Sequence, residues 1–245
     1  MTALRFRDLT LAYDGHPVVH HLDGAVARGA LLAVVGPNGA GKSSLLKAIV
    51  GQLTPAGGAL EVDPALRRRL AYLPQAAEVD LSFPLSVYDF VAMGLWRELG
   101  PFRGVGREAA ARIAAALAAV GLDGFEARPI GALSGGQRQR MFFARLALQK
   151  AELILLDEPF NAIDEPTKLD LFALVERWHG EGRTVVAVLH DLALVRARFP
   201  QTLLLARDVV AWGPTATVLS PVNLARAAGM VEAFDPAADL CASAA

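Results

Sequence analysis

The sequence has 245 residues but only one cysteine, Cys241, and no excess of either charge. A single cysteine excludes an intrachain disulfide and is typical of a reducing compartment. The 24 Lys and Arg residues nearly balance the 25 Asp and Glu residues, so the chain lacks the basic character of a dedicated nucleic-acid binder. We therefore expect no nucleic-acid partner.

Long apolar runs are missing as well. No stretch approaches the ~20 apolar residues that a membrane-spanning helix needs. The start, MTALRFRDLT, carries charges where a signal peptide has its apolar segment. Neither tandem repeats nor a coiled-coil insertion interrupts the sequence. These absences predict a cytoplasmic chain.

The sequence does contain a clear pattern of strands and helices. Residues 4–13 alternate apolar and polar, which predicts a half-buried strand. Continuous apolar runs at 31–36, 153–159 and 184–191 predict strands that are buried on both faces. Shorter strands are expected in GALEV and RLAYLPQ, a closing hairpin in LLLARDVVAWG, and helices within 83–120 and at about 167–179. The pattern predicts an α/β core that is interrupted by a helical insert.

The segment GPNGAGKS, residues 36–43, follows a predicted buried strand and matches the phosphate-binding pattern G-x-x-x-x-G-K-[ST]. Its glycines let backbone N–H groups surround a phosphate at a helix N-terminus. Lys42 is expected to reach the β- and γ-phosphates, and the Ser43 hydroxyl to bind Mg²⁺. The alternative is a glycine-rich turn that fits the pattern by chance. The predicted nucleotide-binding residues here are Gly36, Pro37, Asn38, Gly39, Ala40, Gly41, Lys42, Ser43 and Ser44.

Polar side chains follow two of the predicted buried strands. Asp157 and Glu158 end the run LILLDEP, at the strand edge where ligands bind in open α/β sheets. Asp157 could hold Mg²⁺, directly or through water, and Glu158 could accept a proton from an attacking water. His190 follows TVVAVL and could hydrogen-bond a γ-phosphate or position water. The alternatives are a charged strand end that caps the next helix and a structural histidine.

The segment LSGGQRQR, residues 133–140, indicates a second phosphate site. Ser134 is expected to cap a helix, while Gly135 and Gly136 leave backbone amides open at its start. Two such sites in one domain suit a single ATP poorly. The sequence therefore poses the question of what completes each site.

The order of these motifs resembles that of the ATP-binding cassette family over nearly the whole chain. The matching elements are Tyr13, GPNGAGKS, YLPQ, LSGGQ, LILLDEP, NAID and HD. The resemblance implies a P-loop NTPase (RecA-like) α/β core with an N-terminal antiparallel β subdomain and an inserted α-helical subdomain. It implies one ABC ATPase domain at 1–230, with the helical insert at about 83–133, and a C-terminal tail at 231–245.

The same resemblance implies that two copies enclose two ATP molecules head to tail. Ser134, Gly135, Gly136 and Gln137 of one copy then close on the γ-phosphate that the other copy holds. A homodimer that binds ATP and Mg²⁺ is therefore expected.

Three further roles are implied by the resemblance. Tyr13 would stack on adenine, although it could be an ordinary strand aromatic. Gln75 would contact Mg²⁺ or the attacking water and relay the nucleotide state, although it could be a polar strand end. Asp164 would support the contact across the dimer. Asn161 stands where a Ser is usual and Leu189 where a Thr is common, and we expect both departures to tune rates only.

The segments 78–96 and 158–167 resemble the ATPase subunits of bacterial zinc and manganese importers, and relatives that import iron–siderophore complexes or vitamin B12 share parts of them. The first segment is expected to be partly core and partly a groove for a partner helix. The resemblance implies an ATPase on the inner face of the cell membrane that drives a separate permease and, indirectly, works with an extracytoplasmic metal-binding protein. The alternatives are a soluble assembly factor, as in iron–sulfur cluster biogenesis, and a nucleic-acid-associated cassette ATPase.

The histidines of GHPVVHHLDG could suggest a zinc site. However, strand alternation places His20 and His21 on opposite faces, and no cysteine or closely spaced carboxylate completes a tetrahedral ligand set with His16. We expect plain surface histidines in a β-turn region.

Overall fold

The computed structural model describes residues 1–75, 83–100 and 104–232, and its strands form two sheets. The smaller sheet is antiparallel with the order β2-β1-β4, and the larger has the order β5-β6-β7-β3-β8-β9. In the larger sheet only the β8–β9 pair is antiparallel. The strands are β1 Thr2–Tyr13, β2 His16–Ala27, β3 Leu31–Val35, β4 Gly57–Val62, β5 Leu70–Leu73, β6 Leu153–Asp157, β7 Thr184–Val188, β8 Gln201–Ala206 and β9 Asp208–Pro214.

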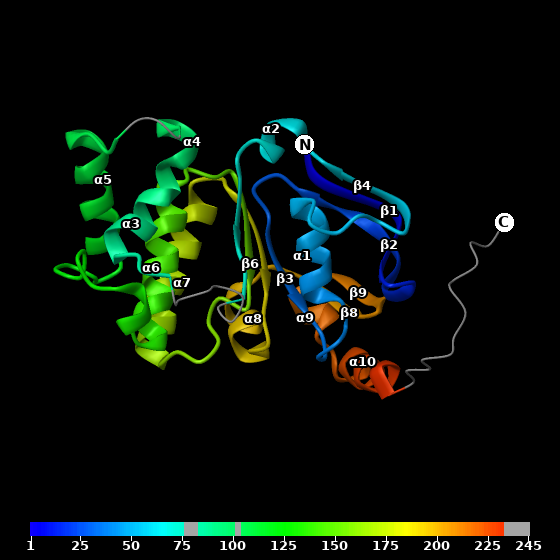
Figure 1. Cartoon of the computed structure of the whole chain (residues 1–245). Coiled ribbons are helices and arrows are strands. Elements are labelled where there is room, and N and C mark those ends of the chain that lie inside the picture. Colours follow the sequence, from blue (N-terminus) through cyan, green and yellow to red (C-terminus); the bar gives the residue numbers. More distant parts are fainter. Residues whose placement is uncertain (76–82, 101–103, 233–245) are drawn as a thin grey trace.

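Helices cover both faces of the larger sheet (Figure 1). The helices from α3 to η3 lie within the insert that was predicted at 83–133. Residues 101–103 of this insert lie outside the described part of the chain. The helices are α1 Lys42–Val50, α2 Pro64–Arg67, α3 Val87–Ala92, η2 Met93–Leu95, α4 Trp96–Leu99, α5 Arg107–Ala118, η3 Ile130–Ala132, α6 Gly135–Leu148, α7 Glu165–Gly180, α8 Leu192–Arg198, α9 Thr215–Val218 and α10 Pro221–Glu232.

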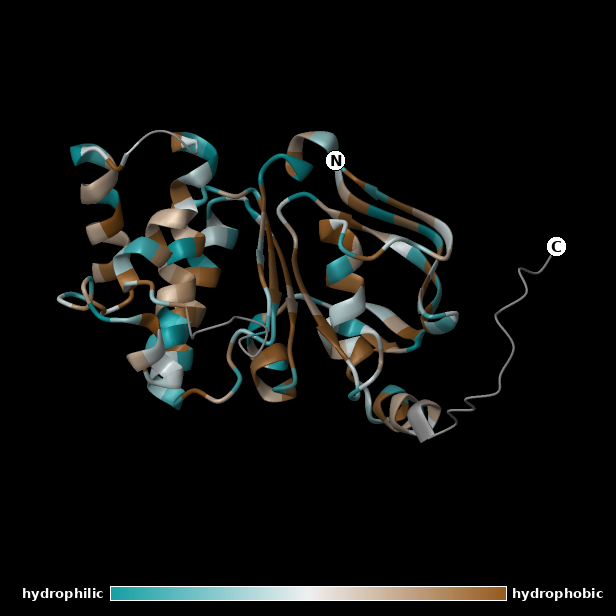
Figure 2. Cartoon of the chain, in the orientation of Figure 1, coloured by the Kyte–Doolittle hydropathy of each residue, from teal (hydrophilic) through white to brown (hydrophobic). Residues whose placement is uncertain are grey.

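The central strands are apolar without interruption because both of their faces are buried. Leu31, Ala33 and Val35 of β3 pack into the core on the helical side, whereas Leu32 and Val34 pack into the core that contains α1. Figure 2 shows these apolar strands between helices whose outer faces are hydrophilic. The predicted buried strands and the α/β fold class are confirmed.

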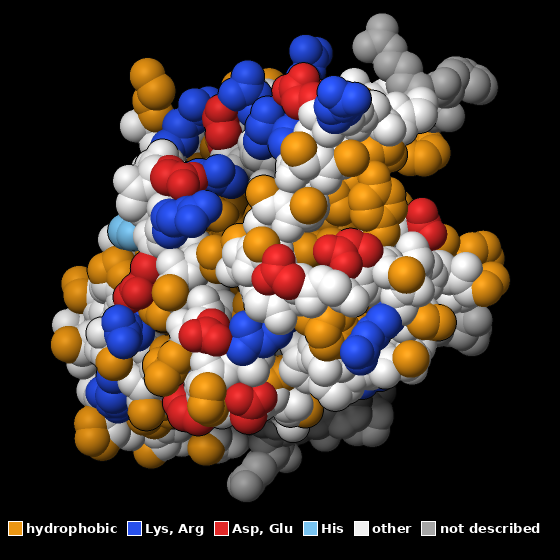
Figure 3. Space-filling model, turned by 90° about the vertical axis from the view of Figure 1, so that its left-hand side faces the viewer, with side chains coloured by type: hydrophobic (Ala, Val, Ile, Leu, Met, Phe, Trp, Pro, Cys, Tyr) orange, Lys and Arg blue, Asp and Glu red, His pale blue; other side chains and the backbone are white. Residues whose placement is uncertain are grey.

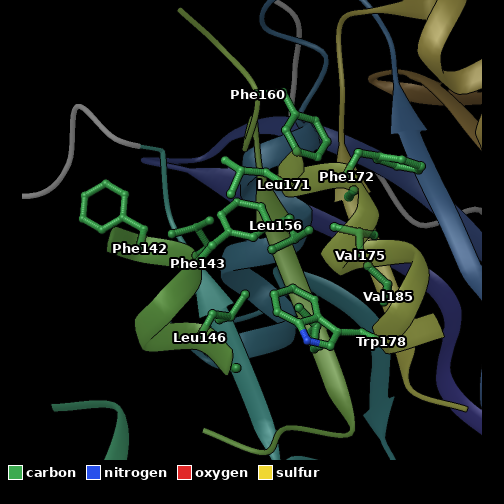
Figure 4. Close-up of a cluster of buried hydrophobic side chains, with 14 of the residues drawn as sticks. Phe142, Phe143, Leu146, Leu156, Phe160, Leu171, Phe172, Val175, Trp178 and Val185 are labelled. Atoms are coloured by element: carbon green, nitrogen blue, oxygen red, sulfur yellow. The ribbon is translucent and has the colours of Figure 1, made fainter. Parts of the chain in front are cut away.

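The core on the helical side joins α6 and α7 to β6. In Figure 4, Phe143, Val175 and Trp178 gather beside Leu156 of β6, while Phe142 points away from them. The rings of Phe143 and Trp178 are stacked with centroids 5.8 Å apart. This cluster fixes both helices against the sheet.

The second core lies between the two sheets and encloses α1, which Figure 1 shows between them. Phe6 of β1 and Trp212 of β9 contact each other across the sheets, with ring centroids 5.9 Å apart. The N-terminal sheet is therefore packed onto the larger sheet beside the loop that precedes α1.

Most of the predicted elements are present. The hairpin expected in LLLARDVVAWG is confirmed by β8 and β9. The helix expected at about 167–179 begins earlier, at Glu165, because Asp164 caps it and a proline lies in its first turn. Helix α10 continues to Glu232 across the predicted start of the tail. The rest of that tail, 233–245, lies outside the described residues, as does Cys241.

No helix in the described residues combines the length and hydropathy that crossing a membrane requires.

Candidate functional site

The loop between β3 and α1 forms the floor of the candidate site. Gly36 has φ 152°, and a Cβ atom there would lie 1.8 Å from the carbonyl oxygen of Leu205. Gly41 has φ 87°, and its Cβ would lie 2.3 Å from the carbonyl oxygen of Val18. Both positions therefore require glycine. Above the loop lies a hollow of about 220 Å³, lined by Val18, Asn38, Gly39, Ala40, Gly41, Lys42, Ser43, Ser44 and Glu158.

Lys42 is buried at the start of α1. Its Nζ donates hydrogen bonds to the carbonyl oxygens of Gly36, at 2.9 Å, and Pro37, at 2.8 Å. Burial lowers the pKa of Lys42, and the nearby carboxylates of Glu158 and Asp157 oppose that shift. A cation held in this way at a helix N-terminus matches a phosphate anion.

Ser43 and Asp157 lie next to each other beside Lys42. The Ser43 hydroxyl donates to Asp157 Oδ1 at 3.0 Å, and the side chain of Asp157 is buried at the end of β6. Hydroxyl and carboxylate oxygens are ligands that Mg²⁺ prefers. The two predicted metal-binding residues from separate segments are therefore brought together, and their chemistry fits the ion.

Glu158 receives contacts from three side chains, two of which come from segments that are distant in the sequence. Gln75 Nε2 donates to Oε2 at 3.0 Å, Asn161 Nδ2 donates to the same oxygen, and His190 Nε2 lies 2.6 Å from Oε1. The backbone of Glu158 is left-handed, with φ 49°, a costly conformation that is typical of functional sites. The structure thus joins Gln75, Glu158 and His190 at the hollow of the P-loop.

The segment 133–137 lies elsewhere. Ser134 caps α6, since its hydroxyl accepts from the Gln137 N–H at 3.3 Å while Gln137 Oε1 accepts from the Ser134 N–H at 3.0 Å. A Cβ atom on Gly136 would lie 3.5 Å from Asp164 Oδ1, so this segment packs beside the loop before α7. Among the described residues that line the hollow, none comes from Ser134–Gln137.

Asp164 caps α7, accepting from the Thr167 N–H at 3.1 Å. Hydrogen bonds from Thr167 lower the pKa of Asp164. This carboxylate is therefore ionised at neutral pH and lies next to the glycines of the 133–137 segment.

Tyr13 is at the end of β1, opposite His16 of β2, and its side chain is 44% exposed. It is not among the residues that line the hollow, although Val18 of the same hairpin is. An exposed aromatic beside the P-loop is compatible with adenine stacking, and that role stays a prediction.

Two contributors to the site carried little sequence signal. Val18 lies against Gly41 only because the N-terminal sheet packs onto the P-loop, which no local pattern encodes. Asn161 attracted notice as a departure from the family pattern, yet its contact with Glu158 depends on the turn after β6.

The rings of His20 and His21 lie 6.5 Å apart between their centroids, closer than their expected placement on opposite strand faces implies. His16 and His21 are exposed, and His21 Nδ1 lies 2.6 Å from Asp8 Oδ1. Across the described ranges, no three His, Cys, Asp or Glu side chains lie together as a metal-binding group.

Comparison with known proteins extends these observations. The profile of the ABC transporter family matches residues 19–161. The zinc transport system ATP-binding protein TroB of Treponema pallidum is 41% identical over 231 residues, covering 93% of this chain and 87% of the relative. The manganese transport system ATP-binding protein MntB of Listeria monocytogenes is 40% identical over 215 residues, covering 86% and 90%. A structure described as a metal-chelate type ABC transporter, facing inward, has a TM-score of 0.82 at 30% identity, covering 94% of this chain and 90% of that chain.

The relatives and the solved structure cover 86–94% of the chain, and the fold of that structure agrees with its topology. They confirm the expected cassette fold, in which a P-loop core sheet carries an N-terminal antiparallel β subdomain. The chain belongs to the ABC transporter family as an ATP-binding subunit, an ATPase that is coupled to transport.

Proposed function

We propose that two copies of this chain close around two ATP molecules. Within one chain, the P-loop hollow is bordered by Lys42 and Glu158, whereas Ser134 and its neighbours lie beside the loop before α7. This separation is the observation that carries the proposal, because a phosphate on the P-loop lacks the second set of amides. Ser134, Gly135, Gly136 and Gln137 of the partner subunit supply them, and Asp164 supports that contact.

The hydrolytic roles follow from the hydrogen bonds around Glu158. Its carboxylate accepts the proton as a water oxygen attacks the γ-phosphorus and the bond to the β-phosphate oxygen breaks. Gln75 and His190 hold the two carboxylate oxygens in place, and Lys42 offsets charge on the β- and γ-phosphates. Ser43 and Asp157 would hold Mg²⁺, with Gln75 as a further candidate ligand, and the ion supplies charge neutralisation there.

We also propose the transported cargo. The relatives named as zinc and manganese transport proteins support uptake of a divalent transition metal through a separate permease at the inner face of the cell membrane. The similarity to the structure described as metal-chelate type supports an alternative cargo, a chelated metal such as an iron–siderophore complex.

A groove of about 470 Å³ is the proposed permease contact, which we call the permease groove. It lies at the C-terminal ends of α1 and α6, whereas the phosphate-binding segments precede their N-termini. Movement at the nucleotide is thereby transmitted along both helices. The groove is lined by Val50, Gln52, Leu70, Ala71, Tyr72, Met93, Gly94, Trp96, Arg97, Arg145 and Gln149.

Metal uptake tests the proposed function most simply. Cells that lack this subunit are supplied with zinc, manganese or an iron chelate one at a time, and uptake is compared after restoring the wild-type chain or the Glu158→Gln variant. The wild-type chain is expected to restore uptake of zinc or manganese, and the variant to restore none. Restored uptake of iron chelates alone would favour the alternative, and unchanged uptake of every metal would contradict metal import.

A further inference from the structure

The permease groove contains an arginine, Arg145 of α6, that faces no carboxylate within the described part of the chain. Its buried Nε has no hydrogen-bond partner among the residues that the structure describes. Its guanidinium carbon lies 5.0 Å above the centre of the buried Phe90 ring. Burial lowers the pKa of Arg145, and no carboxylate among the described residues offsets that shift. Arg145 as a whole is partly buried, and desolvating a guanidinium without a neighbouring anion is costly to the isolated chain.

The surroundings of Arg145 are electropositive. Among the described lining residues of the groove, Arg97 is a second cation and none is acidic. Figure 3 shows Lys and Arg side chains, with fewer Asp and Glu side chains between them, along the upper edge of the helical face, where Figure 1 places α2 and α4. Arg67 ends α2, and Arg68 and Arg69 follow it; all three are exposed, and Arg69 pairs with Glu152. Arg112 also has a buried nitrogen, Nη2, without a partner among the described residues, but its Nη1 donates to the Glu98 carboxylate at 2.5 Å.

We propose that Arg145 forms an ion pair with an Asp or Glu side chain of the permease segment that docks in this groove. The inference rests on the proposed function and adds the chemistry that the partner must carry. Apolar groups of that permease segment contact Met93 and Trp96, whose side chains are 37% and 61% exposed. The carboxylate of the same segment reaches the Arg145 guanidinium, which lies between these two side chains and α6. The desolvation cost that the isolated chain bears is thereby offset only in the complex.

The position of Arg145 gives this pair a mechanical role. Arg145 lies on α6, the helix that Ser134 caps. The two residues are about 16 Å apart along the helix axis at 1.5 Å per residue. Ser134 and Arg145 are joined by one continuous helix, Gly135–Leu148, so a displacement at one end is passed to the other. Closure on the phosphate at one end of α6 therefore displaces the permease carboxylate at the other.

The first test compares Arg145→Met and Arg145→Lys with Lys150→Met as the control. Lys150 is 70% exposed just beyond α6 and does not line the groove. Affinity for the detergent-solubilised permease of the same transporter, ATP turnover of the isolated chain and its Tm are measured for each. Arg145→Met is expected to lose at least about tenfold in permease affinity, with Tm and isolated turnover unchanged or raised. Arg145→Lys retains part of the affinity, and Lys150→Met behaves as the wild type.

The second test works from the permease side and does not depend on the folding of Arg145→Met. Each Asp and Glu in the cytoplasmic loops of the permease is changed to its amide. One such change is expected to reproduce the loss and to add nothing when combined with an Arg145 variant. The proposal is wrong if no permease change does so, or if Arg145→Met binds like the wild type. It is also wrong if Glu78→Gln or Asp80→Asn, at positions outside the described residues, accounts for the loss instead.

The two hypotheses fail differently. A wild-type chain that binds no permease contradicts the proposed function. A wild-type chain that binds well, with Arg145 variants that bind equally, contradicts only the ion pair.

Discussion

The side chains of the site have the chemistry that their sequence motifs predict, whereas the backbone at Glu158 has an uncommon left-handed conformation. Asp157 and Glu158 are adjacent in the sequence, yet one is buried beside Ser43 and the other turns through a left-handed conformation into the P-loop hollow. The LILLDEP pattern predicted both acids at a strand end. It could not predict which donors each would meet, because Gln75 and His190 lie in the segments after two other strands, β5 and β7.

Lys42 tests the phosphate-binding role at the residue scale. Lys42→Ala is expected to weaken ATP binding by about tenfold or more, since a hydrogen bond to a charged group contributes about 1.5–3 kcal/mol. Calorimetric titration of ATP into the purified variant measures this effect. Lys150→Ala, at an exposed site outside the P-loop, should bind ATP like the wild type. Equal ATP affinity of the wild type and both variants would show that Lys42 does not contribute to phosphate binding.

Asn161 offers a second residue-scale prediction. Its amide donates to the same oxygen of Glu158 that Gln75 contacts, which restrains the carboxylate and occupies a lone pair. Asn161→Ser is expected to raise kcat of ATP hydrolysis, by up to about tenfold if one charge-assisted bond is lost, with KM for ATP unchanged. Steady-state kinetics measure both constants. A fall in kcat would mean that Asn161 positions Glu158 for catalysis and does not restrain it.

At the scale of elements, the sequence predicted what depends on local pattern. The apolar runs predicted β3, β6 and β7, and α7 was predicted with its start two residues late. The helix begins earlier because Asp164 caps it and Pro166 lies in its first turn, and neither residue belongs to the apolar period. The sequence did not show which side chains of segment 83–96 are buried and which are exposed. Val87, Phe90 and Val91 are buried, whereas Phe83 and Trp96 are exposed, and only the packing of α3 on α6 decides which side chains remain at the surface. Residues 78–82 of the predicted groove segment lie outside the described part.

The cap of α8 gives a pH-dependent prediction. Asp191 accepts from the Leu194 N–H at 3.0 Å and from Lys168 Nζ at 2.9 Å, and these contacts lower the pKa of Asp191. The cap contributes about 1 kcal/mol, and the partly exposed ion pair adds little. Asp191→Ala is therefore expected to lower the free energy of unfolding by about 1 kcal/mol at pH 7.

The sign of the pH effect follows from the lowered pKa. The contribution of Asp191 is complete above its unfolded pKa of about 3.9 and is lost as the pH falls through the folded value. Urea denaturation from pH 7 to pH 3 should show the wild-type and Asp191→Ala curves converging in acid. A difference that stays constant over that range would mean that the ionised carboxylate does not contribute.

At the scale of the molecule, the chain is two sheets and a helical region held together by α1 and α6. Both helices have a phosphate-binding segment before their N-termini and contribute to the permease groove near their C-termini. The sequence could predict the two phosphate-binding segments but not their separation within one chain, because that distance is set by how the helical region packs on the sheet. The proposed dimer resolves this separation, since a second copy brings its 133–137 segment to the P-loop.

The most direct test of the dimer is sedimentation of the Glu158→Gln variant. This change keeps the side-chain shape but removes the proton acceptor, so ATP should bind and persist. Analytical ultracentrifugation is expected to find monomers without nucleotide and dimers with saturating ATP and Mg²⁺, with Lys42→Ala added to the same chain returning the sample to monomers. A Glu158→Gln protein that hydrolyses ATP at the wild-type rate, or that stays monomeric with ATP bound both alone and with its permease, would contradict the account.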